Sequence, residues 1–542
     1  MIGFIFSSFV TILGYFLVGK IYSSINFNTN KINTFEKLIY GFIIISFISV
    51  LINFFFPLNK FINTFFLFIL IVIFFLKKNT ISKQEIFTLV FISLLTCMFI
   101  ALDTINRPDG MIYHYPFSKI LNEEKIILGI SNIHFRFAHS SILQYSSSIN
   151  NNYLLGDLGL IIPTASIYIS ILLYILRELY FSLKKKDFSL SKVFLVLVTF
   201  YISYKINRYS KIGNDDIGHL ISFLIVYKFL NFKSFNINNF KYLSLLSVFA
   251  ISNKFSLIIF SLFPLIMLIN NKKYFNRIIF SLPSFFLVIW FFKNLLVSGC
   301  FLYPISQTCL ESLSWTNTEV IEQQKISGEA WAKDWPNYID QKSGMEDYVK
   351  NFKWLNTWSN NHLKIVLKNI IPLIFISILI ILYNGKNYYK KPINIFDGKI
   401  SYTILILLLG TIIFFLKFPL YRYGYSYLIS IIALITVIFV DNENKVKMLN
   451  ISKYTIIFIL IALPTKQLLR YYKFFGERPI VPQYTDINLK LKKINIDNNF
   501  NYYLNDESQY CWYNKPICTY YEVKNIKVEK FKSYIILSLK EK

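Results

Sequence analysis

Long apolar runs alternate with short polar connections along most of the chain. Runs of roughly 17–25 residues are long enough to cross a hydrocarbon core of about 30 Å as single helices. The pattern predicts spans near 2–22, 38–57, 60–76, 85–102, 154–178, 192–207, 217–231, 242–250, 254–270, 277–298, 364–383, 400–418, 425–440 and 453–468. The runs 242–250 and 254–270 are short and separated by Ser252-Asn253-Lys254, which predicts either a kinked hairpin or one bent helix. We therefore expect an all-α polytopic membrane protein with about 12–14 transmembrane helices.

The end of the chain has a different pattern. From about residue 473, polar and apolar residues alternate in the segments 501–504, 523–528 and 534–539. Alternation with a period of two is typical of half-buried strands. A segment this small has little core of its own, so we expect a disulfide and contact with the membrane domain to support it. The expected fold class is therefore a membrane helix bundle with outer loops and a small α+β C-terminal domain.

Composition excludes a soluble globular domain. Of the 542 residues, 54% are hydrophobic and 18% are aromatic, which is above the usual balance. The formal net charge of +27 would by itself allow a nucleic-acid partner. However, lysines greatly outnumber arginines and gather in the short connections between spans, as in cytoplasmic loops of membrane proteins. We therefore expect the lipid bilayer, and no nucleic acid, as the partner of this charge.

The basic connections predict the topology. They lie near residues 20–37, 77–83, 184–192, 228–241, 272–277, 386–391 and 445–447, and counting spans places all of them on one side. The positive-inside rule makes that side cytoplasmic. The opposite, outer side receives 103–150, 205–216, 299–362, 420–424 and the tail from about 473. Both termini are therefore expected to face outward.

Four of the five cysteines fall on the expected outer side. Cys300 and Cys309 share one loop, Cys511 and Cys518 share the tail, and Cys97 lies inside a span. Short-spaced pairs in an oxidising compartment predict two local disulfides, Cys300–Cys309 and Cys511–Cys518. Four unpaired thiols are the alternative. A zinc site is less favoured, because neither pair has the short ligand spacing and few histidines lie nearby.

Polar chemistry is concentrated in four outer elements. The first, 103–141, contains three of the five histidines, and its core reads Arg107-Pro-Asp109-Gly-Met-Ile-Tyr113-His114-Tyr-Pro116. The second is 208–219, the third is a loop rich in tryptophan and acidic residues within 315–358, and the fourth is 417–424. The candidate residues in the first element are Asp103, Arg107, Asp109, Tyr113, His114, Arg136 and His139. Those in the second and fourth are Arg208, Lys211, Asp215, Asp216, Tyr421 and Arg422.

Each element also has a purely structural explanation. Acidic residues in outer loops are usually only solvated, and tryptophans beside spans commonly anchor a helix at the membrane interface. Asp215 and Asp216 can cap the helix expected to begin near Ile217, because carboxylates favour helix N-termini. His219, one turn further in, is more often a packing residue than a catalyst.

The arginines favour a functional interpretation. In a chain that uses lysine freely, the outer elements contain Arg107, Arg136, Arg208 and Arg422. The guanidinium group is a planar fork that can bind phosphate through two parallel hydrogen bonds. Carboxylates beside arginines at an outer membrane face suit a lipid-phosphate substrate whose sugar is moved to an acceptor, with a carboxylate as general base.

The segment Asp109-Gly-Met-Ile-Tyr113-His114-Tyr-Pro116 resembles the Asp-x-x-x-Tyr-His-x-Pro pattern in the first external loop of GT-C fold glycosyltransferases, particularly the mannosyltransferase-like membrane proteins of bacterial envelopes. The arrangement is similar too, with a span, a long outer loop, two further spans and a second acidic motif. The resemblance covers roughly 85–300 by motif. It implies that Asp109 is the catalytic base and that a polyprenyl-phosphate sugar is the donor. Two departures are the three extra spans at the N-terminus and Asp103, a second candidate acid.

We therefore expect an inverting glycosyltransferase in a bacterial inner membrane, with its active site facing the periplasm. Asp109 is the expected base with Asp103 as its rival, and Asp215 or Asp216 would orient the acceptor or donor. The expected substrate-binding residues are Arg107, Tyr113, His114, Arg136, His139, Arg208, Lys211, Tyr421 and Arg422. The expected partners are a polyprenyl-phosphate-linked sugar and a lipid or glycan acceptor. No cofactor is expected, although a divalent metal where the carboxylates converge stays open.

This interpretation divides the chain into five parts: added N-terminal transmembrane helices (1–84), a GT-C-like catalytic core (85–298) with outer loops 103–150 and 208–216, a periplasmic Trp-rich loop (299–362), C-terminal transmembrane helices (363–470) and a small periplasmic domain (473–542). The main alternative is a lipid-linked oligosaccharide flippase or another transporter, which should carry charges in mid-span and often inverted repeats. Here the charges cluster at span ends and no repeat is visible. A non-catalytic polymer-binding or assembly protein, suggested by the tryptophans, would leave the acidic clusters unexplained.

Overall fold

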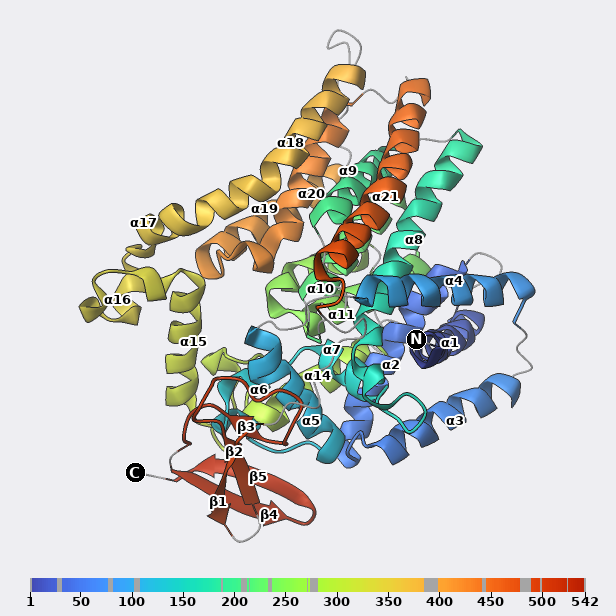
Figure 1. The fold of residues 1–542 in the computed structure, drawn as a ribbon. Coiled ribbons are helices and arrows are strands. Elements are labelled where there is room, and N and C mark those ends of the chain that lie inside the picture. Colours follow the sequence, from blue (N-terminus) through green and yellow to red (C-terminus); the bar gives the residue numbers. More distant parts are fainter. Residues whose placement is uncertain are drawn as a thin grey trace.

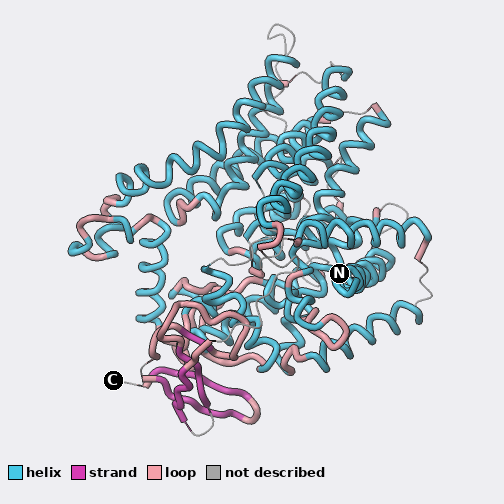
Figure 2. The backbone as a smooth tube through the Cα atoms, viewed as in Figure 1, coloured by secondary structure: helices cyan, strands magenta, loops and turns pink. Residues whose placement is uncertain are grey.

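The computed structural model describes residues 2–26, 32–76, 81–101, 108–186, 189–205, 212–213, 215–232, 236–270, 272, 281–384, 398–440, 445–477, 489–497, 500–523 and 525–540. Helices make up most of it, and the strands are confined to the C-terminal tail at one end (Figure 2). Within these ranges, eight helices are long and apolar enough to cross a membrane, and three shorter apolar helices accompany them. A helix coincides with each predicted span.

The first four helices are α1 (Ile2–Asn26), α2 (Thr34–Phe55), α3 (Lys60–Leu76) and α4 (Lys83–Ile100). Two glycines let the backbones of α1 and α2 touch. A Cβ atom on Gly19 would lie 1.7 Å from the carbonyl oxygen of Lys37, and one on Gly41 would lie 1.7 Å from that of Tyr15. Small residues at close helix contacts are typical of membrane bundles, where van der Waals packing holds helices together.

The long outer loop after α4 folds into short helices. They are the π-helix η2 (Gly110–His114), α5 (Tyr115–Glu123), η3 (Ile130–Asn132), α6 (Phe135–Ala138), α7 (Ile142–Ser148) and η4 (Gly156–Leu160). Most of the residues in these helices are buried. The amide of Asn63, at the start of α3, donates to the carbonyl oxygens of Ser148 (2.8 Å) and Asn151 (2.7 Å). The loop is therefore part of the folded body and can hold side chains in defined positions.

Two further groups of helices complete the bundle. The first group is α8 (Ile162–Lys185), α9 (Leu190–Lys205), α10 (Asp215–Asn231), α11 (Ile237–Asn253), η5 (Phe255–Ser261), α12 (Leu262–Ile269) and α14 (Leu282–Ser298). The second group is α18 (Lys364–Asn384), α19 (Gly398–Lys417), α20 (Tyr421–Phe439) and α21 (Lys445–Phe474). In Figure 1, α8, α9, α18, α19, α20 and α21 run side by side, and α9 packs against both α20 and α21. These contacts join the two groups into one body.

The polar break at 252–254 separates two helical arms. Helix α11 ends at Asn253, Lys254 has an extended backbone (φ −150°, ψ 120°), and η5 begins at Phe255. The arms pack on each other, with the Ser247 hydroxyl 3.3 Å from the carbonyl oxygen of Phe260. The two runs therefore form the kinked hairpin, and the alternative of one bent helix is wrong.

The Trp-rich loop forms a small unit of its own. Its elements are η7 (Ser306–Thr308), α15 (Thr318–Ala332), η8 (Trp335–Asn337), η9 (Gln341–Ser343), α16 (Met345–Lys350), α17 (Trp354–Trp358) and the π-helix η10 (Ser359–Leu363). Trp335, Tyr348, Trp354 and Trp358 build a separate apolar core. The buried indole of Trp358 donates to the carbonyl oxygen of Pro419 at 2.8 Å. Trp358 is therefore a packing residue of this unit.

Ion pairs join the connections predicted to lie on one side. Glu85, at the start of α4, accepts from Lys20 (2.8 Å) and Lys37 (3.0 Å), which lie near the facing ends of α1 and α2. At the same end of the bundle, Lys228 of α10 pairs with Glu36 of α2 at 2.6 Å. The end of α1, the starts of α2 and α4 and the end of α10 therefore lie at the same end of the bundle.

The tail contains the strands β1 (Lys492–Asp497), β2 (Phe500–Leu504), β3 (Cys518–Thr519), β4 (Ile526–Phe531) and β5 (Tyr534–Leu539). The first three form a sheet in the order β1-β2-β3, and β4 and β5 form an antiparallel pair. This confirms the predicted strands. The tail also docks on the outer loop, because Leu128 bridges to Ile536 of β5. The predicted support from the membrane domain is therefore present.

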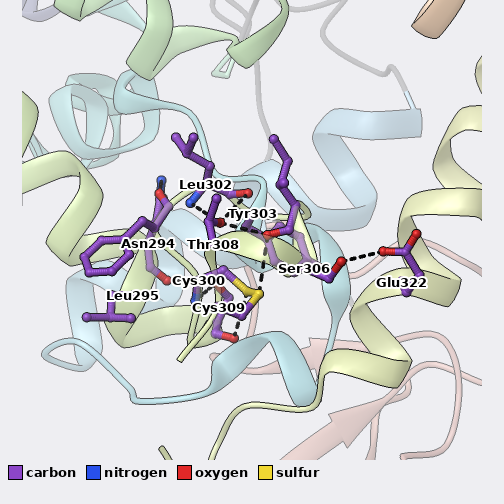
Figure 3. The surroundings of a disulfide bond; sticks show 12 residues. Asn294, Leu295, Cys300, Leu302, Tyr303, Ser306, Thr308, Cys309 and Glu322 are labelled. Atoms are coloured by element: carbon purple, nitrogen blue, oxygen red, sulfur yellow. Dashed lines mark hydrogen bonds between the residues drawn. A yellow bond between two sulfur atoms is a disulfide. The ribbon is translucent and has the colours of Figure 1, made fainter. Parts of the chain in front are cut away.

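Both predicted disulfides are formed, Cys300–Cys309 and Cys511–Cys518. Figure 3 shows the first of them closing a loop at the end of α14, where the Ser306 hydroxyl donates to Glu322 of α15 at 2.7 Å. Cys97 is a free, buried thiol in α4. The cysteine pattern alone therefore predicted the covalent cross-links of both outer segments.

Candidate functional site

Asp109 lies between two arginines from distant parts of the chain. Its Oδ1 is 3.3 Å from Nη1 of Arg136, and its Oδ2 is 2.8 Å from Nη1 of Arg422. The carboxylate side chain is 20% exposed, so it stays accessible to a ligand. The structure thus brings together three of the residues that the sequence singled out.

Local structure explains how Asp109 and Arg136 are placed. Asp109 immediately precedes the π-helix η2, an insertion type that is frequent at functional sites because it redirects side chains. Arg136 lies in the first turn of α6, where Nδ1 of His134 accepts the backbone N–H of Arg136 at 3.1 Å. The guanidinium of Arg136 also lies over the ring of Tyr113, 4.9 Å from its centroid. Both side chains are therefore restrained by their own short helices.

Arg422 is positioned by His219. Arg422 stands in the first turn of α20, and its carbonyl oxygen is 2.9 Å from Nε2 of His219 in α10. A carbonyl can only accept, so Nε2 carries the proton, and Nδ1 of the neutral ring accepts from the Ser426 hydroxyl at 2.8 Å. His219 is therefore a buried packing residue, as the sequence favoured, that also positions one of the arginines.

The second acidic pair opens α10. Asp215 pairs with Lys254 at 3.3 Å, and Asp216 accepts from the hydroxyl of Tyr425 at 2.9 Å. Both carboxylates stand in the first turn of the helix, where the helix dipole favours negative charge. The two aspartates therefore stabilise the start of α10 and also bind side chains from distant segments. Helix capping alone does not explain their contacts with Lys254 and Tyr425.

Tyr423 joins the two acidic centres. Its hydroxyl accepts from Nη2 of Arg422 at 2.9 Å, and its ring lies under the ammonium group of Lys254, 3.9 Å from the centroid. Asp109, Arg422, Asp215 and Lys254 thus form a continuous cluster of alternating charge around one aromatic ring. We use the name acid–arginine cluster for Asp109, Arg136, Asp215, Asp216, Lys254, Arg422 and Tyr423.

Tyr113 and His114, both in η2, connect the cluster to neighbouring segments. Nδ1 of the buried His114 ring accepts from the side-chain amide of Gln144 at 3.1 Å. Gly213, with φ +72°, lies directly against that ring, and a Cβ there would be 2.2 Å from Nδ1. Burial, with the nearby charge of Asp109, raises the pKa of Tyr113 well above its usual value. Tyr113 therefore stays a neutral phenol, and His114 connects the first acidic element to the second.

His139 marks the border with the Trp-rich loop. Its ring packs edge-on against Tyr303, with the centroids 4.8 Å apart, and Tyr303 belongs to the Cys300–Cys309 loop (Figure 3). Loss of hydration, with the charges of Lys254, Arg136 and Lys293, lowers the pKa of His139 to about 3. The side chain nevertheless keeps an exposed surface. A neutral imidazole beside three cations suits hydrogen bonding to a ligand, and a proton-donating role at neutral pH is disfavoured.

Tyr421 belongs to a separate group of tyrosines. Its hydroxyl is 2.8 Å from that of Tyr201 in α9, and its ring stacks on Tyr425 at 5.7 Å. Through the bond from Tyr425 to Asp216, this tyrosine group reaches the acid–arginine cluster. Tyr421 therefore contacts the cluster indirectly.

Four candidate residues lie outside the described residues: Asp103, Arg107, Arg208 and Lys211. Their roles stay predictions. Lys254, Tyr423 and Tyr425 were not among the predicted site residues. For Lys254, a lysine at the break between two apolar runs was the available sequence signal.

The tail stabilises the position of η2. The backbone N–H groups of Cys511 and Trp512 both donate to the carbonyl oxygen of Met111, at 3.0 and 2.9 Å. The hydroxyl of Tyr513 also donates to the side chain of Asn122 in α5 at 2.8 Å. The loop closed by Cys511–Cys518 therefore holds the segment that carries Asp109.

Replacing both Cys511 and Cys518 by serine should loosen this contact. Removing a short disulfide loop is expected to cost the tail about 2–3 kcal/mol of stability, and η2 would lose its two backbone donors. Limited proteolysis of membranes should then cut the tail at much lower protease concentration than in the wild type. The pair Cys300→Ser and Cys309→Ser is the matched control, because it removes the other disulfide, which lies at the end of α14 and outside the tail. Equal tail cleavage in both variants would contradict this role.

The charge pattern of the cluster suits an anion more than a metal ion. Cations lie beside the carboxylates Asp109 and Asp215. Within the described ranges, no group of three or more histidine, cysteine, aspartate or glutamate residues gathers in a way that could hold a metal ion. The exposed guanidinium and ammonium surfaces instead offer hydrogen-bond donors to phosphate or carboxylate.

Comparison with known proteins gives one family. No curated protein and no solved structure matches the chain. Residues 1–429 match the domain of unknown function DUF8201. This range contains all seven residues of the acid–arginine cluster and ends within α20, before the tail. The match covers well over half of the sequence, and the chain therefore belongs to the DUF8201 family.

Proposed function

We propose that this protein is an inverting membrane glycosyltransferase. It would transfer a sugar from a polyprenyl-phosphate donor to an envelope glycan or lipid acceptor, at the outer face of a bacterial inner membrane, within a GT-C-like fold. The observation that carries the proposal is the position of Asp109 between Arg136 and Arg422, with Asp215 and Asp216 beside them. The reaction needs a base, hydrogen-bond donors that bind the lipid phosphate, and polar groups that orient the substrates. Asp109, the two arginines and the second acidic pair could supply them.

The reaction is a displacement at the anomeric carbon of the donor sugar. The acceptor hydroxyl oxygen bonds to that carbon while the bond from the carbon to the phosphate oxygen breaks. The hydroxyl proton goes to Asp109, and the electron pair leaves with the lipid phosphate. Arg136 and Arg422 stabilise the charge that develops on the departing phosphate oxygen.

The two arginines also explain how a paired carboxylate can act as a base. The carboxylate of Asp109 holds both guanidinium groups by ion pairs. A bound lipid phosphate competes for the same guanidinium groups. Once it takes them, the carboxylate of Asp109 is released from both ion pairs and can accept the hydrogen bond of the acceptor hydroxyl. Substrate binding would in this way activate the base, while Asp215 or Asp216 orients a hydroxyl of the acceptor or donor.

One observation favours the flippase or transporter alternative. The side chain of Lys293 in α14 is fully buried, donates to Asn294 at 3.2 Å and lies 4.2 Å from the ring centroid of Trp290. Ionisable residues inside spans often mark transport paths. The two functions differ in what accumulates when the protein is absent.

The test compares cells that lack the protein with cells that express it. Mass spectrometry would follow both the envelope glycans and the extracted lipid-phosphate sugars. A transferase predicts that a glycan loses one sugar and that its polyprenyl-phosphate donor accumulates. A flippase predicts complete lipid-linked oligosaccharide retained on the cytoplasmic leaflet, without a rise in that donor. An unchanged glycan profile would overturn both.

A further inference from the structure

A groove runs along one face of α21, away from the acid–arginine cluster. Its volume is about 520 Å³, within the range of small-molecule sites. Within the described chain, its lining includes Phe458, Ile461, Ala462, Lys466, Arg470 and Lys473, all on α21. With a rise of 1.5 Å per residue, this face extends for about 22 Å along the helix. The groove therefore has the length of a substantial part of a lipid chain.

The groove is amphipathic along its length. Phe458, Ile461 and Ala462 line one end, and the cations Lys466, Arg470 and Lys473 line the other, towards the end of α21 at Phe474. No carboxylate is among the lining residues that the structure describes. In the predicted topology the C-terminal end of α21 lies at the outer face. The cations then stand at the level of lipid headgroups, with the apolar end deeper in the bilayer.

Neighbouring helices enlarge the positive end. The positive charge of Lys466 interacts with the charges of Arg470 and of Lys205, which ends α9. Lys205 in turn interacts with the charge of Lys368 in α18. Like charges repel, so gathering four cations costs free energy unless an anion offsets it. An anionic headgroup with an apolar chain matches this surface in both charge and hydropathy.

A chain of contacts connects the basic end of the groove to the second acidic pair. Lys466 donates to the carbonyl oxygen of Tyr204 at 3.3 Å, and the ring of Tyr204 lies 5.6 Å from that of Tyr201. The ring of Tyr201 in turn lies 5.6 Å from that of Tyr425, whose hydroxyl donates to Asp216. Lys466 is therefore linked to Asp216 through Tyr204, Tyr201 and Tyr425, of which Tyr201 and Tyr425 are buried.

We propose that this groove binds the acceptor, and that the acceptor is a lipid with a phosphate headgroup. Its chain lies along the apolar end on α21 and its phosphate at Lys466 and Arg470, so that its glycan head leaves the groove at the basic end. The donor phosphate is assigned to Arg136 and Arg422, so the groove supplies a second, separate site for an anionic lipid. The inference rests on the proposed transferase function, and it narrows the acceptor to a lipid-linked molecule.

The test uses the full chain in nanodiscs of phosphatidylcholine and a photoreactive isoprenyl diphosphate as the probe. Labelled peptides should come from 458–473. The double variant Lys466→Gln and Arg470→Gln should lower this labelling about tenfold or more, because two charge-assisted contacts are lost. Ala462→Trp should lower it as well, by filling the apolar end without changing charge. Lys453→Gln, on the same helix but outside the groove, is the matched control and should label like the wild type.

The outcomes distinguish lipid binding in the groove from the proposed transferase function. Unchanged labelling of 458–473 in both groove variants would overturn the proposal, and so would equal competition by phosphatidylglycerol vesicles, which would mark a general phospholipid site. In cells, Ala462→Trp should make the unmodified lipid acceptor accumulate at normal protein abundance. Groove labelling in a protein whose loss leaves the glycans unchanged would overturn the transferase function and the acceptor assignment, while the lipid site itself would remain.

Discussion

Replacing Asp109 with asparagine should abolish sugar transfer and leave the protein in the membrane at normal abundance. Asparagine keeps the shape of the side chain but cannot accept the proton of the acceptor hydroxyl. Loss of a general base typically lowers the rate about 10²–10⁴-fold. The envelope glycan profile should therefore match that of cells without the protein, and the polyprenyl-phosphate donor should accumulate.

The charge change itself should be tolerated by the fold. Asp109→Asn leaves Arg136 and Arg422 without this carboxylate, but their side chains are 33% and 41% exposed. Water therefore compensates for much of the lost pairing, because exposed ion pairs contribute little to stability. Glu123→Gln is the matched control, since Glu123 lies in the same outer loop and pairs only at the surface, with Lys119. That variant should keep normal glycans.

The variant Asp103→Asn decides between Asp103 and Asp109, the two candidate acids of the segment 103–141. If Asp109 is the base, this variant should retain most of the activity. Normal glycans in Asp109→Asn at normal abundance, together with their loss in Asp103→Asn, would transfer the catalytic role to Asp103. Normal glycans in both would remove the base from this loop altogether.

Most helices, three of the strands and both disulfides could be predicted from the sequence, because each depends on residues that are close together in the chain. Apolar runs long enough to span a bilayer gave the helices, and the period of two at the end of the chain gave the strands. Short cysteine spacings on the predicted outer side indicated both disulfides. The ion pairs of Asp109 with Arg136 and Arg422 were not predicted. The scarcity of arginine in a lysine-rich chain and the count of loops on each side singled out the three residues, but as a base and as phosphate ligands.

The missing parts of the site depend on contacts between distant segments. Lys254 reaches Asp215 only because α11 ends at the polar break and turns its flanking lysine towards α10. Tyr423 and Tyr425 were two tyrosines among 38, and hydropathy does not distinguish them from packing residues. The hydrogen bonds from the tail to Met111 involve backbone atoms alone, so no side-chain pattern could indicate them. The burial of Trp358 could not be predicted either, because an indole beside a span has the same sequence context whether lipid or protein covers it.

Replacing Arg422 with lysine should lower transfer strongly although the positive charge is kept. The guanidinium of Arg422 divides its donors between Asp109 Oδ2 through Nη1 and the Tyr423 hydroxyl through Nη2, at 2.8 and 2.9 Å. It therefore connects the base to the ring that also carries Lys254. An ammonium group is a point charge on a flexible stem and cannot reproduce this planar fork. A loss of about 10²–10³-fold is expected, the size typical for one preorganised donor at a developing oxyanion.

Arg136 provides the internal comparison for this prediction. It makes one longer contact with Asp109, at 3.3 Å, so Arg136→Lys should be milder than Arg422→Lys. Arg177→Lys is the matched control, because Arg177 pairs with Glu178 in α8 and lies outside the cluster. The measurement is the fraction of unmodified envelope glycan at equal membrane abundance. Normal glycans in Arg422→Lys alongside a severe defect in Arg136→Lys would reverse the assignment, and Arg136 would then be the principal phosphate ligand. Full activity in both variants would mean that the cluster needs only positive charge, because either side chain would then serve without the guanidinium fork.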